Sequence, residues 1–322
     1  MGKEEVDVQE VARDFKSLIA NILEGSKSDQ VSAGAPFKTD LKDKIHEYRK
    51  YASTPDEVTV AQKKLEVLKT GTFLDELFLN SNEESLNGIP LTAQIGVVGL
   101  SGVGKSILMQ EVALKVACKG KRVLFVTSED AWKTESARYD LQSRMKEKAD
   151  ELAISWNKIK ANLLVLDTIS ESKLRIWDIF VETYRYLVEN NGVDLLIIDS
   201  LSIMEAHAGA LKRRILELSR YNQIKGVTAL YVCQRSSEDP DSYAISGGQG
   251  VVHNLDVLLC IDFKKASGTL KNDVNRNKPK DKQVKQWDVI HFVRLMTCRL
   301  CGFYRGYIEL YINNKGLLRK IV

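Results

Sequence analysis

The pattern of apolar and polar positions changes near residue 70. Before that point, apolar residues recur at spacings of three and four, which predicts an amphipathic helix that ends at Gly25. These residues are Val8, Val11, Phe15, Leu18, Ile19 and Ile22. A second short helix is expected over 41–48, and a third is expected to begin at Thr54, an N-cap followed by Pro55. Their narrow apolar stripes predict that residues 1–67 form a helical appendage that docks on the core domain or on a neighbouring subunit.

From residue 71 onward, short apolar segments alternate with longer helical patterns. Six segments rich in Val, Ile and Leu predict strands that are buried on both faces of a parallel sheet. They are 94–98, 122–127, 162–166, 193–198, 227–233 and 255–261. Helices are predicted between most of them, at 105–118, 131–153, 171–190 and 208–222. The alternation predicts that residues 68–322 form an α/β domain, a mostly parallel sheet flanked by helices.

The C-terminal part has a different pattern. Segments 288–296 and 305–312 alternate apolar and polar residues, which predicts an antiparallel hairpin at the edge of the sheet. Before them, residues 264–285 carry eight Lys or Arg residues against two Asp residues, and we expect a long, mobile loop there. Such a loop is either a solvated insertion or a segment that follows the phosphates of a nucleic acid.

Composition and charge exclude some classes of protein. The chain has 322 residues with 47 basic and 43 acidic side chains, and a net charge of +4 is too small by itself to indicate nucleic-acid binding. No apolar run is long enough for a membrane helix, and the polar N-terminus does not have the pattern of a secretory signal. Cys118, Cys233 and Cys260 lie in apolar runs, while the Cys298–Cys301 pair lacks further ligands for zinc. We therefore expect a reduced, cytoplasmic protein without a membrane partner.

Residues 99–106, GLSGVGKS, have the spacing of a phosphate-binding loop between a buried strand and a helix. Glycines let the loop curl so that backbone amides point at phosphate oxygens, next to the positive end of the helix. In such a loop Lys105 reaches the outer phosphates and Ser106 binds Mg²⁺. The residues expected to bind the nucleotide are Gly99, Ser101, Gly102, Val103, Gly104, Lys105, Ser106 and Ile107.

Two further segments end in acidic residues. Asp199 follows the apolar run 193–198, so it is expected at the carboxyl edge of the sheet, where it either binds Mg²⁺ with Ser106 or caps the strand end. Glu129 and Asp130 follow the strand predicted at 122–127. A carboxylate there would orient or deprotonate an attacking water, but Ser128-Glu129-Asp130 would equally suit the start of the next helix.

In their order along the chain, these motifs resemble those of the RecA-type ATPases, most closely the KaiC-like and RadA-like branches. The similar segments include LKTGTFLDELF, VLFVTSED, DLLIIDS, ALYVCQRS and VRLMTCRLCGFYRGYIELY, over about residues 68–318. The resemblance implies a RecA-like fold and ATP and Mg²⁺ as ligands. It further implies catalytic roles for Lys105, for Glu129, for Gln234 as the sensor of the γ-phosphate, and for Arg299 as a finger that reaches the next subunit's site.

The resemblance also implies a homo-oligomer, a ring or a filament, that hydrolyses ATP. One expected use is DNA recombination, repair or replication; the alternative is a nucleotide-dependent switch that controls a protein partner, with residues 1–67 as a contact. The acidic segment 236–250 disfavours DNA, whereas the basic segment 264–285 favours it. Relatives often have a lysine where this chain has Thr297, which leaves a third possibility, a scaffold that binds nucleotide without hydrolysing it.

Overall fold

The structure is a computed structural model, and it describes residues 65–134, 140–201, 210–235, 245 and 249–321. The helices predicted within residues 1–64 and most of the acidic segment 236–250 lie outside the described residues. The division at residue 67 therefore stays a prediction. Among the described residues, no helix has the length and apolar character needed to cross a membrane.

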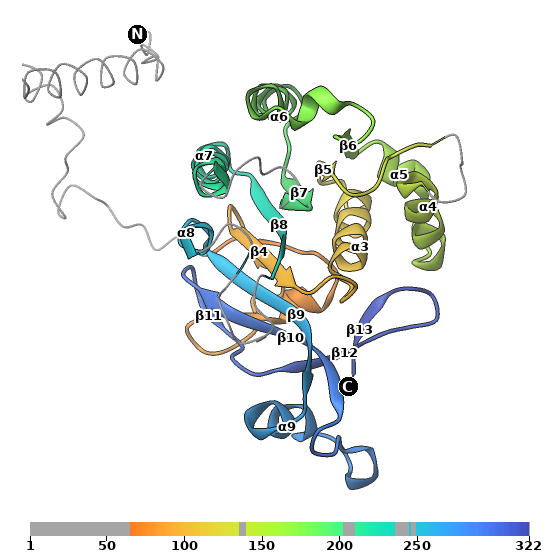
Figure 1. Cartoon of the computed structure of the whole chain (residues 1–322), viewed down its shortest axis with the longest axis vertical. Helices are drawn as coiled ribbons and strands as arrows, with labels where there is room; N and C mark the ends of the chain where they lie inside the picture. Colours follow the sequence, from red (N-terminus) through yellow and green to blue (C-terminus); the bar gives the residue numbers. More distant parts are fainter. Residues whose placement is uncertain (1–64, 135–139, 202–209, 236–244, 246–248, 322) are drawn as a thin grey trace, which may run out of the picture. The chain divides into compact units, whose positions relative to one another are not determined.

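A nine-stranded sheet forms the centre of the described structure, in the order β13-β12-β10-β9-β4-β8-β7-β5-β6 (Figure 1). Six of these strands run parallel to one another. They are β4 (Gln94–Gly99), β5 (Val123–Thr127), β6 (Leu163–Asp167), β7 (Leu195–Asp199), β8 (Thr228–Gln234) and β9 (Val257–Lys265). Every residue of β4, β5 and β7 is buried, as expected for strands covered on both faces. The predicted α/β class and its mostly parallel sheet are confirmed.

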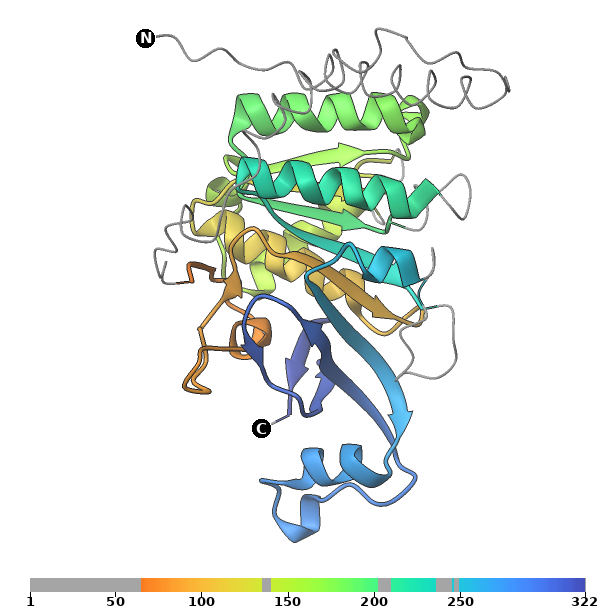
Figure 2. The same ribbon diagram turned by 90° about the vertical axis from the view of Figure 1, so that its left-hand side faces the viewer.

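Helices cover the two faces of the sheet. Helices α3 (Lys105–Cys118), α4 (Leu141–Glu151) and α5 (Trp156–Lys160) pack in one apolar cluster. Helices α6 (Trp177–Asn191), α7 (Ala210–Lys225) and α8 (Gln249–Val252) pack in a second cluster on the other face (Figure 2).

The helix predicted at 131–153 is wrong in its extent. Residues 131–134 are not helical, and α4 begins after Asp140, whose carboxylate accepts a hydrogen bond from the amide of Ser143 at 2.7 Å. The helical pattern ends at Leu152, because Ala153 has a φ of +54°. Asp140 is the N-cap of α4 because its carboxylate satisfies a backbone amide of the first turn.

The C-terminal strands confirm the predicted hairpin at the sheet edge. Strands β10 (Val289–Cys298) and β12 (Ile308–Ile312) are antiparallel, and β13 (Leu318–Lys320) pairs with β12 at the outer edge. The long, mobile loop expected at 264–285 does connect two antiparallel strands, β9 and β10, but it is not without secondary structure, since it contains helix α9 (Gly268–Asn275) and a 3₁₀ turn, Lys280–Lys282. Leu270 and Val274 of α9 are buried. We call residues 263–289 the β9–β10 arm; it extends beyond the sheet (Figure 2).

Short elements before β4 lie beside the sheet. Strand β1 (Val67–Leu68) pairs with β3 (Ile89–Pro90), and β2 (Phe78–Leu79) pairs with β11 (Gly302–Phe303). Between them, a 3₁₀ helix spans Phe73–Glu76, and another, Ser172–Arg175, precedes α6. The carboxylate of Asp75 accepts hydrogen bonds from the amides of Thr70 and Gly71 at 2.8 and 2.7 Å, which fixes the turn into the domain.

Candidate functional site

A pocket of about 160 Å³ lies at the carboxyl ends of the parallel strands, where open α/β sheets bind ligands. The loop between β4 and α3 forms one side of it, and residues that follow or end β5 and β8 form the rest. The lining residues are Ser101, Gly102, Gly104, Lys105, Ser106, Ile107, Glu129, Val232 and Gln234. Of the predicted loop residues, Gly99 and Val103 do not line the pocket.

Glycine is required at two places in the loop. Gly104 has a φ of +89° directly before α3, a conformation that side-chain-bearing residues rarely adopt. At Gly99 a Cβ atom would lie 1.9 Å from the carbonyl oxygen of Ile261 in β9. The loop can therefore turn away from β4 at this point only if residue 99 has no side chain.

The side chain of Lys105 is buried within its own loop. Its ammonium group donates to the carbonyl oxygens of Gly99 at 2.9 Å and Leu100 at 2.6 Å. Burial lowers the pKa of Lys105, and the negative charges of Asp199 and Glu129 oppose that shift. A cation held in this way beside exposed loop amides makes the pocket suited to an anion.

Ser106 and Asp199 lie together at the edge of the pocket. The Ser106 hydroxyl donates to Oδ1 of Asp199 at 3.0 Å. Burial raises the pKa of Asp199 to about 7, and the neighbouring carboxylates of Glu129 and Asp130 add to the shift. A hydroxyl and a buried carboxylate are oxygen ligands of the kind that Mg²⁺ prefers, and a cation would stabilise the ionised carboxylate. The donor set therefore fits a magnesium ion.

The structure separates the two acids that the sequence left equivalent. Asp130 forms an ion pair with Arg144 of α4 at 2.6 Å, whereas Glu129 lines the pocket. No helix begins at Ala131, so the interpretation of this segment as a helix start is wrong. Next to Glu129, the buried Ser128 hydroxyl donates to the Ser200 carbonyl at 2.7 Å and accepts from the Ser200 amide at 2.8 Å. These bonds tie the Glu129 segment to the end of β7.

Gln234 is the last residue of β8 and is exposed at the pocket, level with Gly99 of the neighbouring β4. Behind it, the buried guanidinium of Arg235 is paired with the buried Asp262 of β9, with Nε and Oδ2 2.8 Å apart. This pair was not predicted from the sequence. The signal was available, because an aspartate inside the apolar run of β9 has to find a partner when it is buried.

His291 of β10 was also overlooked. Its Nε2 lies 2.9 Å from the carbonyl oxygen of Val103, so a side chain from a distant strand contacts the middle of the loop. Burial lowers the pKa of His291. The neutral imidazole therefore supports the loop from behind and does not line the pocket.

The structure does not bring Arg299 to the pocket of its own chain. Arg299 directly follows β10, where Cys298 pairs with Val257, the first residue of β9. Val257 in turn is level with Ile95 near the start of β4, so Arg299 lies at the opposite end of the sheet from the loop. Its guanidinium is exposed and donates to the carbonyl of His253 at 2.8 Å.

The two cysteines on either side of Arg299 are in contact. The sulfur atoms of Cys298 and Cys301 lie 3.7 Å apart, and both side chains are half-buried. A hydrogen bond from Cys301 lowers the pKa of Cys298 to about 6, while the same contact raises the pKa of Cys301. Among the residues that the structure describes, no group of three or more His, Cys, Asp or Glu side chains is placed to hold a metal ion.

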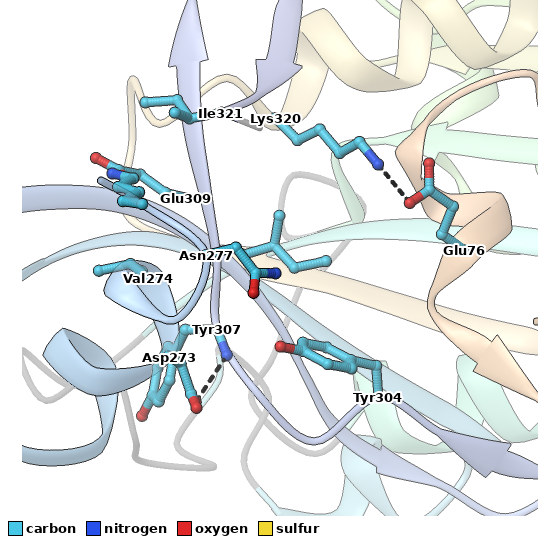
Figure 3. Close-up of a pocket in the computed structure, with 11 residues that line it drawn as sticks. Glu76, Asp273, Val274, Asn277, Tyr304, Tyr307, Glu309, Lys320 and Ile321 are labelled. Carbon is cyan, nitrogen blue, oxygen red and sulfur yellow. Dashed lines mark hydrogen bonds and ion pairs between the residues drawn. The ribbon is translucent and has the colours of Figure 1, made fainter. Parts of the chain in front are cut away.

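A larger pocket, of about 310 Å³, lies between α9 and the C-terminal strands (Figure 3). Its charged side chains are matched to one another. Lys320 pairs with Glu76 at 2.5 Å (Figure 3). Lys278 pairs with Glu309. Asp273 accepts from the amide of Tyr307 at 3.2 Å. None of the predicted site residues lines this pocket, and its paired charges select no ligand of a given charge, so the smaller pocket is the candidate site.

Comparisons with known proteins identify the family and the fold. The model of the KaiC ATPase family matches residues 68–317. Among solved structures, a KaiC-like protein from the hyperthermophilic archaeon Pyrococcus horikoshii OT3 has 15% sequence identity and a TM-score of 0.57. The match covers 80% of this chain and 100% of that chain, and it shows a shared fold. No curated protein is similar enough in sequence to match.

Proposed function

Because this chain belongs to the KaiC family of ATPases, we propose that it binds ATP with Mg²⁺ in the pocket described above and hydrolyses the terminal phosphate. The observation that supports this most directly is that one pocket collects Lys105, Glu129 and Gln234, which come from three different strand ends. Lys105 provides a cation that can bind phosphate, and Glu129 provides a carboxylate that can bind water. Gln234 provides an amide that can donate to a phosphate oxygen.

Each residue of the pocket has a proposed role in binding ATP or in its hydrolysis. The amides of the loop and the first turn of α3 bind phosphate oxygens, and Lys105 exchanges its two carbonyl acceptors for the outer phosphates. Ser106 and Asp199 would hold Mg²⁺, which would neutralise charge on the phosphates. Glu129 orients the attacking water and accepts its proton. Gln234 donates to the γ-phosphate, so the position of its side chain at the end of β8 depends on whether that phosphate is present.

Active protein is proposed to be a ring or a filament of identical subunits. Arg299 is exposed at the end of the sheet opposite the pocket, so it is available to a neighbouring copy and not to its own nucleotide. An arginine supplied in this way stabilises the charge of the transition state. Cys233 and Cys260 are buried and form no disulfide, which fits a reducing, cytoplasmic setting.

Two single substitutions test the chemistry. Glu129→Gln should retain ATP binding and lower the rate of hydrolysis by about 10²- to 10⁴-fold, since it removes a general base. Lys105→Ala should abolish hydrolysis, because the loop loses its cation. Phosphate release and binding of a fluorescent ATP analogue are the measurements, and Glu147→Gln, an exposed carboxylate change on α4, is the control. Normal turnover by Glu129→Gln would contradict the assignment.

DNA is the partner that the β9–β10 arm favours. Lys265, Lys280 and Lys282 are exposed on it, and the Trp287 side chain is 63% exposed. Exposed lysines and an exposed aromatic ring on one segment are typical of surfaces that bind single strands by charge and stacking. A role in recombination, repair or replication is therefore proposed as the use of ATP, with a nucleotide-dependent switch on a protein partner as the alternative.

One assay distinguishes these uses. ATP turnover is measured with and without single- and double-stranded DNA, at several protein and salt concentrations. Stimulation by DNA that is lost in a Lys280→Gln, Lys282→Gln variant supports the DNA role, with Lys146→Gln as a control cation on α4. Turnover that depends on protein concentration but not on DNA supports the switch. A wild-type protein that binds ATP without hydrolysing it would leave only the third possible function, a scaffold that binds nucleotide.

A further inference from the structure

Helix α4 carries two cations that contact segments on either side of the nucleotide pocket. Arg144 and Lys148 are four residues apart, so they lie one above the other on the same face of the helix. Arg144 contacts the segment that carries Glu129, and Lys148 contacts the helix that carries the phosphate loop. The two contacts therefore link the two halves of the site through one rigid element.

The first turn of α4 is attached to the residues that follow Glu129. The amides of Leu141 and Gln142 donate to the carbonyls of Ala131 and Trp132, each at 3.1 Å. Arg144 adds the ion pair with Asp130 at 2.6 Å. Asp130 is the neighbour of Glu129 in the chain, so a displacement of Asp130 moves the backbone of Glu129.

One turn later, Lys148 attaches α4 to α3. Its buried ammonium donates to Oε1 of Gln110 at 2.9 Å and to the carbonyl of Ile107 at 3.3 Å. Ile107 lines the nucleotide pocket. Met145 and Ala149, on either side of Lys148, are fully buried in the apolar cluster that contains α3. The position of α4 is thus fixed relative to the first turn of α3.

We propose that α4 sets the position of the Glu129 carboxylate relative to the phosphate loop, with Arg144 and Lys148 as positioning residues. The proposal rests on hydrolysis with Glu129 as the base. Arg144 and Asp130 are 40% and 45% exposed, and an ion pair between half-exposed charges adds little to stability. Its effect is therefore expected in the rate of the chemical step, where a displacement of about 1 Å costs up to about 100-fold.

The experiment is a double-mutant cycle on full-length protein. Arg144→Gln should lower kcat about 10- to 100-fold and leave the dissociation constant of ATP within about twofold, because the phosphate loop itself is untouched. Asp130→Asn should give the same loss, and the double variant no more than either single variant, since both remove one contact. Arg144→Lys should retain most of the rate, because it keeps the charge. Lys146→Gln, on the exposed face of α4, is the control and should keep the wild-type rate.

Lys148 gives an independent measurement. Lys148→Met removes the bonds to Gln110 and Ile107 with little change in side-chain length, and it should also lower kcat more than ATP affinity. Its melting temperature is recorded, since a buried group is changed. Additive losses in the cycle, or a wild-type kcat in Arg144→Gln, would overturn the positioning role while leaving ATP hydrolysis in place. A wild-type protein without hydrolysis would overturn both proposals.

Discussion

At the scale of single residues, the site depends on glycines, which have no Cβ atom, as much as on its polar side chains. Gly99 and Gly120 both have positive φ values, +157° and +83°. A Cβ at Gly120 would have no neighbour within 4 Å, whereas a Cβ at Gly99 would collide with the carbonyl of Ile261. The two glycines thus separate the cost of an unusual backbone angle from the cost of a clash.

Replacement of each glycine by alanine measures these costs. Gly120→Ala is expected to lower the free energy of unfolding by about 1 kcal/mol, the cost of the left-handed conformation. Gly99→Ala should lower it by at least about 1–3 kcal/mol more, because backbone of β9 has to move. Urea unfolding of both variants, with ATP binding measured in parallel, is the test. Equal losses of unfolding free energy in the two variants would show that β4 and β9 can move apart at Gly99 at little cost.

The sequence predicts the loop residues well because their spacing is local. Glycine, lysine and serine at fixed positions in one segment specify a turn that does not depend on the rest of the chain. Glu129 and Asp130 could not be separated in this way. What distinguishes them is Arg144, which lies fourteen residues later in the sequence and meets Asp130 only because α4 begins at Leu141.

At the scale of elements, the strands on either side of β4 are joined beneath the phosphate loop. The sheet order is β9-β4-β8, and the Arg235–Asp262 ion pair connects the end of β8 to β9 across the end of β4. The amide of Arg235 also donates to the carbonyl of Gly99 at 3.3 Å. Both side chains of the pair are almost completely buried. Such a pair is costly to break because each charge needs the other.

We expect Asp262→Asn to lower the free energy of unfolding by about 3–5 kcal/mol, since it leaves a buried guanidinium without its counter-charge. Replacing both residues with apolar ones, Arg235→Met and Asp262→Leu, should cost much less than the single change. Urea unfolding of the single and double variants provides the comparison. A double variant that is less stable than Asp262→Asn would argue that the pair contributes net stability.

Buried strands were the elements that sequence predicted best. Each of the six parallel strands begins within two residues of its expected start, because continuous runs of Val, Ile and Leu mark a strand covered on both faces. The segment at 131–153 could not be predicted as reliably, since its polar pattern contains a non-helical start before helix α4, and α5 begins only after it, at Trp156. Residues 264–285 were taken as a loop because their lysines obscured the two buried residues of α9, Leu270 and Val274.

At the scale of the whole molecule, the nucleotide pocket and Arg299 lie at opposite ends of the sheet. A single subunit therefore has the proposed phosphate-binding pocket without the arginine, and the arginine without a phosphate to contact. If the proposed finger acts between subunits, each complete site combines residues of two copies.

Mixing two inactive variants tests this arrangement. Arg299→Ala keeps the pocket, and Lys105→Ala keeps the arginine. If Arg299 acts between copies, each variant alone should hydrolyse ATP at least about 10³-fold more slowly than wild type, while their mixture should recover part of the activity. Turnover of the mixture is compared with that of each variant at the same total concentration. A mixture no more active than its components, with co-assembly shown by light scattering, would rule against a shared site.

The central place of β4 has a consequence for how the protein is made. The backbone amide of Gln94 in β4 donates to the carboxylate of Asp256, which lies 162 residues later in the chain. Both strands that flank β4, β8 and β9, are translated after it. At typical rates of synthesis, roughly 10–30 s pass between the appearance of β4 and that of β9. During that interval the ribosome holds a strand that is apolar after Gln94 and lacks its neighbours, so chaperones or early helix contacts have to protect it from aggregation before any nucleotide can bind.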